Sequence, residues 1–416
     1  MSELPATSAS TTAAPPAALP ADASSGSVGD RWTGRRPRAA TLVRFGLVAV
    51  LAVLPLYLGT SLLQTGLFAM AAVIGAIGLT ILTGTAGQLS LAHAFFLAVG
   101  AYGYSYFAGV ADPSGASAAA GLGLPPVLAM ILAVAVAGVT GLLFSPIASR
   151  LRGIYLGVAS LSLVFIGSFL YENFRALTGG FNGRPATDFS ILGFQFAPEH
   201  PFLTVLNVPF GRFERLWYLF LALTVASYVF GVNVLRGRMG RAMQTMRDSE
   251  TAASAMGVNV RRVKAGAFIL SSTYAGLAGV LIALAFTRVT PDYFILPLSI
   301  SYLAMVVIGG LGSIGGASVG AVFVTALPPL LSRYSDLLPF VAAAGSGGYD
   351  EGKITAVLYG AAVILIVLFE PGGLSALGRR LFRRPAPTRA LGRSASRRRA
   401  SGTPAASDNH HQEDHA

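Results

Sequence analysis

Residues 62–88 read LLQTGLFAMAAVIGAIGLTILTGTAGQ, and this stretch decides the class of fold. Its apolar part, 62–83, is as long as a helix that crosses a lipid bilayer, for which about 20 residues are needed. The surrounding residues 45–110 contain no Asp, Glu, Lys or Arg. The stretch therefore predicts a membrane-spanning helix rather than a helix in a soluble core.

The end of this stretch, TGTAGQ (83–88), predicts a break in the helix within the membrane. Unwound backbone at that depth is tolerated only where it meets protein or a water-lined cavity. Free N–H and C=O groups at such a break suit a zwitterionic solute, although close packing alone explains the glycines equally well. The residues that we consider for a solute path are Thr83, Gly84, Gly87, Gln88, Ser90 and His93.

His93 is the ionisable residue of this region, and ionisable groups at membrane depth are often functional. The alternative, which we favour, is a buried histidine that is hydrogen-bonded to a neighbouring helix. A metal site is not expected, because no second ligand stands three or four residues away from His93.

The whole chain has the composition of a multi-pass membrane protein. Hydrophobic residues make up 53% of the 416 residues and charged residues only 12%, against about a quarter charged in soluble domains. The absence of cysteine excludes disulfides and thiolate metal sites. Apolar segments of sufficient length lie near residues 42–60, 62–83, 86–110, 126–149, 153–171, 217–235, 265–287 and 354–370.

A further apolar region, 298–331, is too long for one crossing and is interrupted by glycines. We expect a helical hairpin or a re-entrant pair there. The fold class is therefore predicted as all-α and polytopic, with about ten membrane segments that include broken or re-entrant helices.

Lysine and arginine predict the sidedness of these segments, because basic residues are enriched in cytoplasmic loops. Arginines precede the first segment, seven basic residues occupy 236–264, and nine lie in 379–399. We expect these regions and both termini on the cytoplasmic side of the cell membrane, and the loop 172–216 on the outer side.

Residues 1–40 and 379–416 are predicted to be disordered tails around a membrane domain, 41–378. Neither interleaved aromatic residues nor a folded module accompanies the basic tail, which favours contact with lipid over nucleic acid.

A polar stretch interrupts the apolar chain at 236–264, RGRMGRAMQTMRDSETAASAMGVNVRRVK. We predict a helix, a turn at Asp248–Ser249, and a short helix from Glu250 to Met256 that Gly257 ends. One interpretation is an amphipathic loop on the inner leaflet, and the other is a docking surface for a soluble partner. Four methionines are predicted to share one helical face: Met239, Met243, Met246 and Met256.

The sequence ETAASAMG (250–257) resembles the "EAA" loop of ABC importer permeases, in which a coupling helix enters a cleft of the cytoplasmic ATPase. The resemblance assigns that contact to Glu250, Ala252, Ala253 and Gly257, with Arg247 and Asp248 beside them. Thr251 stands where the family most often has alanine.

Other motifs extend the resemblance over most of residues 80–375. They are LTGTAGQLSLAHAFFLAVGAY (82–102), LRGIYLGVASLSLVF (151–165), LTGGFNG (177–183), YLAMVVIGGLGSIGG (302–316) and VLFEPGGL (367–374). Together they resemble the branched-chain amino acid ABC permease family, and most closely its M-type subunit. The resemblance implies separate ATP-binding cassette ATPases, an H-type permease subunit and an external solute-binding protein as partners. Ala92 and Thr85 depart from the family pattern, and urea or short amides are the alternative substrates.

Two stretches resemble nucleotide-binding motifs. GGYDEGKIT (347–355) lacks the hydroxyl residue that a P-loop needs after its lysine, and GLGSIG (310–315) lies between apolar runs rather than in a βαβ unit. We therefore expect a transporter subunit with no catalytic residues, no cofactor and no ATP site of its own. An ion-coupled transporter would need charged residues within the membrane, and a membrane enzyme would need clustered histidines or carboxylates.

Overall fold

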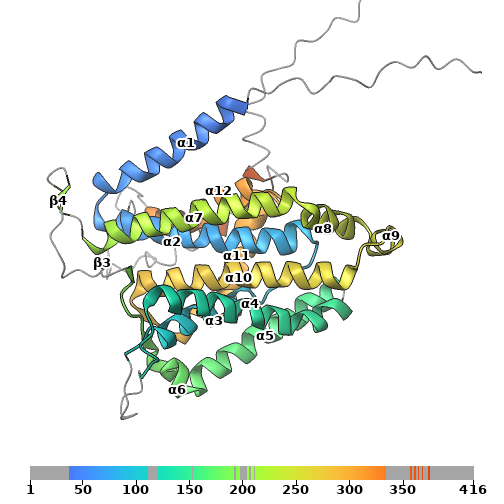
Figure 1. Ribbon diagram of the computed structural model, residues 1–416, viewed down its shortest axis with the longest axis horizontal. Helices are drawn as coiled ribbons and strands as arrows, with labels where there is room; N and C mark the ends of the chain where they lie inside the picture. Colours follow the sequence, from blue (N-terminus) through green and yellow to red (C-terminus); the bar gives the residue numbers. More distant parts are fainter. Residues whose placement is uncertain are drawn as a thin grey trace, which may run out of the picture. The chain divides into compact units, whose positions relative to one another are not determined.

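The computed structural model describes residues 37–110, 120–151, 153–191, 194–196, 204–205, 208–209 and 211–333, with single residues between 357 and 374 (Figure 1). Residues 1–51 and 52–416 form two units. Helix α1 (Pro37–Val53) starts with a proline, which suits the first turn of a helix. It therefore begins just inside the predicted tail 1–40. The basic tail, the sequence 347–355 and most of the segment 354–370 lie outside the described residues.

Helices that are long and apolar enough to cross a membrane dominate the second unit, as the composition predicts. The five such helices in the described part of the chain are Thr60–Thr85 (α2 with its π-helical extension η2), Pro126–Arg150 (α4), Ile154–Asn173 (α5), Arg212–Arg236 (α7) and Val260–Phe286 (α10). The chain also has shorter apolar helices at Phe45–Leu56, Leu296–Gly309 and Ile314–Leu330. The protein is thus a mainly helical, multi-pass membrane protein, while the count of ten segments and their direction stay predictions.

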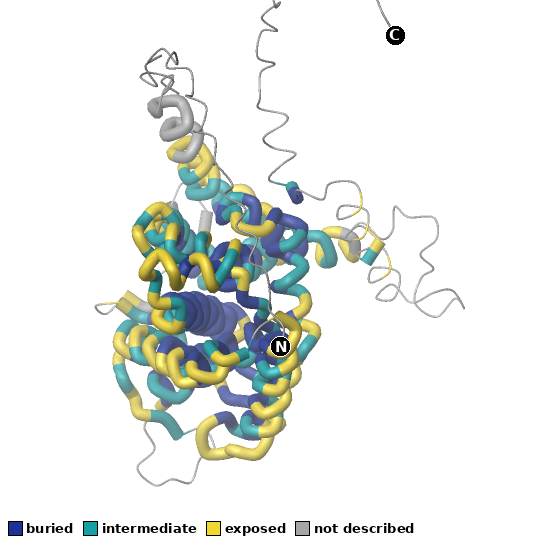
Figure 2. The backbone as a smooth tube through the Cα atoms, turned by 90° about the vertical axis from the view of Figure 1, so that its right-hand side faces the viewer, coloured by how far each residue is buried: buried dark blue, intermediate teal, exposed yellow. Residues whose placement is uncertain are grey.

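Two helices form the centre of this unit, and the others surround them (Figures 1 and 2). In α2 and α10, 83% and 78% of the apolar window is buried, against 22–33% in α4, α5 and α7. The outer helices expose large apolar side chains such as Leu143, Phe165 and Phe230. Because a lipid environment does not penalise exposed apolar surface, these side chains fit a membrane-facing perimeter.

Small residues allow α10 to lie against α3 (His93–Phe107) and α4 at backbone distance. A Cβ on Gly100 of α3 would lie 2.1 Å from the carbonyl oxygen of Gly276. A Cβ on Gly279 would lie 1.9 Å from the carbonyl oxygen of Leu97. This packing is the one expected of membrane helices. Small residues let their backbones approach closely, and van der Waals packing then stabilises their association.

The region 298–331 forms the expected helix pair, α11 (Leu296–Gly309) and α12 (Ile314–Arg333). Gly310 and Gly312 make the turn between them with positive φ angles of 106° and 81°. The sequence GLGSIG is therefore a turn between two apolar helices, and no strand precedes it.

Short strands, which we did not predict, lie with α6 (Arg175–Thr178) and η3 (Gly180–Asn182) at one end of the unit (Figure 1). The described strands form three antiparallel pairs, and β1 pairs with β6 through Arg184↔Val289 and Pro185↔Arg288. They are β1 (Arg184–Pro185), β2 (Ser190–Ile191), β3 (Phe194–Gln195), β4 (Thr204–Val205), β5 (Val208–Pro209) and β6 (Arg288–Val289). A 3₁₀ turn, η4 (Pro291–Phe294), connects β6 to α11. Most of this end comes from the loop that we expect outside the cell.

Candidate functional site

The predicted break after residue 83 is present, and it takes the form of a π-helical turn. Helix α2 (Thr60–Leu79) passes into η2 (Thr80–Thr85), and regular structure then stops until α3 begins at His93. The apolar segment expected from residue 86 is therefore helical only from 93, because Gly87 has a φ angle of +68°. Hydroxyl groups satisfy part of the unwound backbone: Thr83 Oγ1 donates to the Gln88 carbonyl at 3.1 Å.

Serine side chains from three parts of the chain satisfy backbone N–H groups at the start of α3. Ser90 Oγ accepts from the Ala92 N–H, while Ser160 of α5 accepts from Leu91 at 2.8 Å. Ser299 of α11 accepts from the Ala94 N–H at 2.9 Å. A helix start buried in a membrane needs such partners. Ser90 thus has a structural role in this conformation.

His93 lies at the centre of this contact between helices. Its side chain is only 2% exposed, and its ring centroid is 4.6 Å from that of Tyr302 on α11. A Cβ on Gly75 of α2 would lie 3.1 Å from His93 Nε2. The histidine is therefore enclosed by α2 and α11. The burial between helices fits the packing interpretation, but the expected hydrogen bond is missing, because Nε2 has no partner among the residues that the structure describes.

The polar stretch 236–264 contains two helices joined by a sharp turn, as the sequence predicts. We call this pair of helices the elbow. Helix α8 (Arg238–Asp248) and helix α9 (Glu250–Ala255) are separated by Ser249, whose Oγ accepts from the Ala252 N–H at 3.2 Å. Gly257, with φ at +82°, follows α9. The elbow projects from the end of the unit opposite α6 (Figure 1). Helix α9 is thus a short, capped helix that lies at the surface.

One face of α9 is anchored to the membrane helices, and the other is free. Glu250 pairs with Lys264 of α10 at 2.7 Å, and the lysine side chain is fully buried. Ala253 is also buried, whereas Thr251, Ala252, Ser254 and Ala255 are exposed. The residues assigned to coupling are therefore divided, with Glu250 and Ala253 facing inward and Ala252 and Gly257 facing outward. Sequence reasoning did not identify Lys264 as the partner of Glu250, because it counted that lysine only as a basic residue.

The methionines do not form the adaptable docking surface that we had considered. Met243 and Met246 are buried within the chain, and the Met239 methyl group fills the space beside Gly266. Met256 is 66% exposed. The first three methionines do share a face, but that face packs inward, and Met256 lies beyond the turn at Ser249.

Arg247 joins the elbow to the break in the membrane helix, so the two sets of candidate residues meet at one place. Its Nη1 donates to the carbonyl oxygen of Gly84 at 2.5 Å. Asp248, the next residue, is exposed. Of the solute-path candidates, Gly84, Gln88, Ser90 and His93 are buried, Thr83 is half-buried and Gly87 is exposed.

At the opposite end, Arg184 is a fully buried residue that sequence reasoning missed. Its guanidinium donates to the carbonyl oxygens of Ser105, Ala176, Leu177 and Ala120 and lies over the Tyr106 ring. Glu172, Asn173 and Asn182 are exposed at this end. An arginine directly after the glycines of LTGGFNG was the available signal.

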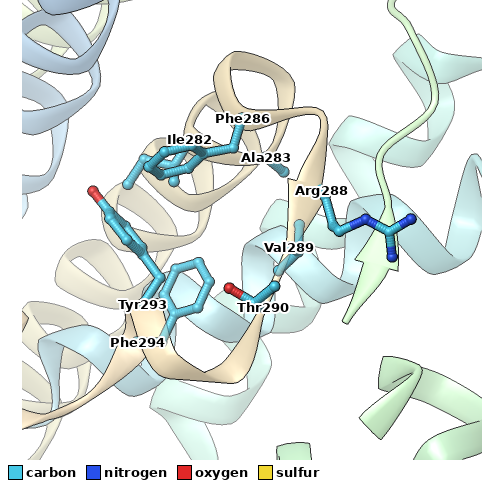
Figure 3. A pocket seen from close by; sticks show the side chains of 8 residues that line it. All are labelled: Ile282, Ala283, Phe286, Arg288, Val289, Thr290, Tyr293 and Phe294. Carbon is cyan, nitrogen blue, oxygen red and sulfur yellow. The ribbon is translucent and has the colours of Figure 1, made fainter. Parts of the chain in front are cut away.

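A small cavity of about 120 Å³ lies near the end of α10, also on this side (Figure 3). Aromatic rings of Phe286, Tyr293 and Phe294 line it, and the Arg288 side chain points away from them. A second hollow of about 240 Å³, between α7 and α10, is lined by Phe230 and Tyr274 among others. Neither contains a residue proposed for the solute path.

Comparison with known proteins gives a family for this arrangement. The family described as the permease component of the branched-chain amino acid transport system matches residues 61–368. The chain is similar to the high-affinity branched-chain amino acid transport system permease protein LivM of Salmonella typhimurium, with 26% identity over 227 residues. That match covers 50% of this chain and 49% of LivM, so the chain spans about half the length of this relative. No solved structure matches the chain.

Proposed function

We propose a function from one premise: the chain belongs to the family of permease components of branched-chain amino acid transport systems. In this proposal it is the membrane-spanning subunit of an ABC importer in the cell's cytoplasmic membrane. It works with an H-type permease subunit, separate cytoplasmic ATPases and an external solute-binding protein. The cargo is a branched-chain amino acid or a related small polar solute.

The observation that carries the proposal is the two-sided character of α9. Its inner side is fixed to α10 through Glu250 and Lys264, and its outer side is a small, exposed, alanine-rich surface. A short helix of this kind can enter a groove on a soluble partner. Ser249 caps the start of α9, which stabilises this short helix as the contact surface for a partner.

The opposite end supplies the second contact surface of the proposal. Glu172, Asn173 and Asn182 are exposed there, beside the strands β1 and β6. An external solute-binding protein would deliver cargo to this side. ATP binding by the ATPases would then change the access to the broken segment near Thr83–Gln88. The chain itself would make and break no covalent bond.

The test is a substitution on the outer face of α9 that leaves its anchor intact. Ala252→Arg places a long charged side chain on that face and should reduce ATPase co-purification and leucine uptake more than tenfold. Gln244→Arg adds the same charge on the exposed face of α8 and is the matched control. Unchanged co-purification of Ala252→Arg would refute the docking role of α9.

The substrate class is tested separately with the assembled importer in proteoliposomes. Uptake of labelled leucine should be competed by isoleucine and valine and not by urea or acetamide. Competition by urea or short amides instead would support the alternative cargo. Uptake by this chain alone, driven by an ion gradient, would overturn the importer proposal.

A further inference from the structure

Arg247 closes a contact between three segments that lie far apart in the sequence. Its guanidinium donates to the carbonyl oxygen of Gly84 in η2. Its aliphatic stem lies on Gly87, where a Cβ would be only 2.9 Å from Arg247 Cγ. A side chain at position 87 would therefore displace the arginine.

The third segment is the turn between α11 and α12. A Cβ on Gly84 would lie 2.5 Å from the backbone nitrogen of Gly312. A Cβ on Gly312 would lie 3.5 Å from Arg247 Nη1. The π-helical turn, the hairpin turn and the arginine thus meet at one place, with the Thr80 methyl group beside them.

The Gly84 carbonyl suits a cation for an electrostatic reason. Carbonyl groups in the last turn of a helix lack partners within the helix and carry partial negative charge. A hydrogen bond from a guanidinium to such an oxygen is charge-assisted and stronger than a neutral one. The bond therefore holds the end of the α2–η2 segment against α8.

We propose that Arg247 is a positioning residue that keeps this end of the solute path shut until α9 moves. The inference rests on the proposed function, and it assigns Arg247 a role inside the chain rather than on the ATPase. Only Ser249 separates α8 from α9, so displacement of α9 shifts the last turn of α8. Arg247 then leaves the Gly84 carbonyl, and η2 separates from the turn at Gly312.

The chain contains no cysteine, which allows a test that needs neither ATP nor partners. A single cysteine at the half-buried Thr83 reports access to η2 through its rate of labelling by a water-soluble maleimide in open membrane fragments. Thr83→Cys should label slowly. Adding Arg247→Ala should raise the rate about tenfold, which is the expected effect of losing one hydrogen bond to a charged group.

Arg241→Ala is the matched control for this experiment. Arg241 lies on the same helix, is exposed, and also donates to a backbone carbonyl, that of Arg236 at 3.0 Å. Its removal should leave the labelling rate of Thr83→Cys unchanged. Equal rates for the Arg247→Ala and unsubstituted backgrounds would overturn the proposal, as would an equal increase with Arg241→Ala.

A reversible crosslink tests whether the contact must open during transport. A Cβ on Gly87 would lie 3.3 Å from Arg247 Cβ, close to the roughly 3.5–4.5 Å between Cβ atoms in disulfides. In the assembled importer, oxidation of the Gly87→Cys/Arg247→Cys pair should abolish uptake while the ATPase subunits stay bound. Reduction of the same sample should raise its uptake above that of the oxidised sample. Full uptake by the oxidised pair would overturn the proposal.

The two experiments separate this inference from the proposed function. If the importer proposal fails, no ATPase co-purifies with the unsubstituted chain, whereas the labelling experiment still reports on the contact. If Arg247 instead binds the ATPase, Arg247→Ala loses the ATPase without faster labelling at position 83.

Discussion

The two ends of the membrane unit each contain an arginine that donates to backbone carbonyl groups, and the two arginines differ in how firmly they are held. Arg184, the first residue of β1, is fully buried and donates to carbonyl groups from four residues. Arg247, in the last turn of α8, is exposed, and within the described part of the chain the carbonyl group that accepts from it belongs to Gly84. The first cannot leave without exposing several buried carbonyl groups, whereas the second gives up a single bond.

From this difference we infer that the Arg184 end keeps its conformation and that the Arg247 end can change its conformation. Arg184, itself in β1, connects α3 to α6 through the carbonyl groups of Ser105, Ala176 and Leu177. The Arg247 end joins a capped, exposed helix to a π-helical turn, and turns of this kind are frequent at functional sites. The predictions below test this contrast, beginning with the largest expected effect.

Arg184→Ala should be the most destructive of these substitutions. It leaves several buried carbonyl groups without a donor, and breaking a buried charged network costs about 3–5 kcal/mol. We expect loss of folded protein, measured by size-exclusion chromatography of the detergent extract and by thermal unfolding. Arg184→Lys keeps the charge but lacks the planar guanidinium group. Its thermal stability should lie between that of the unsubstituted protein and that of Arg184→Ala. Normal unfolding of Arg184→Ala would remove the contrast between the two ends.

Gly183→Ala should also destabilise the Arg184 end, by about 2 kcal/mol, because it combines a strained backbone with a clash. Gly183 has φ at +67°, and a Cβ there would lie 2.1 Å from the Val289 carbonyl oxygen. Gly153→Ala is the control, since Gly153 has φ at +56° and nothing within 4 Å of its Cβ position. Thermal unfolding of the two variants separates the clash from the backbone strain. Equal losses would show that strain alone accounts for the effect.

Glu250→Gln should cost about 1–2 kcal/mol, because it leaves the buried Lys264 ammonium without its carboxylate, a cost reduced by the partial exposure of Glu250. Insertion into the membrane should persist, while uptake becomes uncoupled from ATP hydrolysis. The double variant Glu250→Gln/Lys264→Met removes both charges and should recover the stability. If it also recovers coupled uptake, the ion pair serves folding only, and the elbow end is more rigid than we propose.

Ser249→Ala should have the smallest effect, about 1 kcal/mol, the usual cost of removing an N-cap. The hydroxyl oxygen accepts from the Ala252 N–H, and its loss lets α9 fray while the ion pair at Glu250 remains. We expect little change in thermal unfolding of the whole protein, but faster hydrogen exchange confined to residues 250–256. Faster exchange that spread into α10 would show that α9 and α10 unfold together.

Much of the fold could be predicted from local patterns. Apolar runs between charged loops predicted α2, α4, α5, α7 and α10, and the glycines in 298–331 predicted a helix pair. The break near TGTAGQ was predicted because glycine and threonine are weak helix formers, and these residues follow each other there. The short helix of the elbow was predicted because Asp248 and Glu250 stand where a helix would begin and Gly257 stands where it would end.

Other features could not be predicted, because they depend on contacts between distant residues. The methionines of α8 were predicted to share one helical face, but spacing alone does not tell whether that face is covered or exposed. Lys264 was counted only as a basic residue, and its burial follows from the way α9 folds back on α10. One pair of short strands, β1 with β6, forms by pairing over about a hundred residues of chain, as in Arg184↔Val289.

The sequence by itself determined that this chain is a helical membrane protein with a polar elbow and a broken helix, because composition, periodicity and capping act within a few residues. Only the tertiary structure decided that the elbow and the break touch. A carbonyl group at residue 84 and a guanidinium at residue 247 are brought together by the packing of α2, α7 and α10. No local pattern encodes that meeting, because its geometry is set by where small residues let the helices approach.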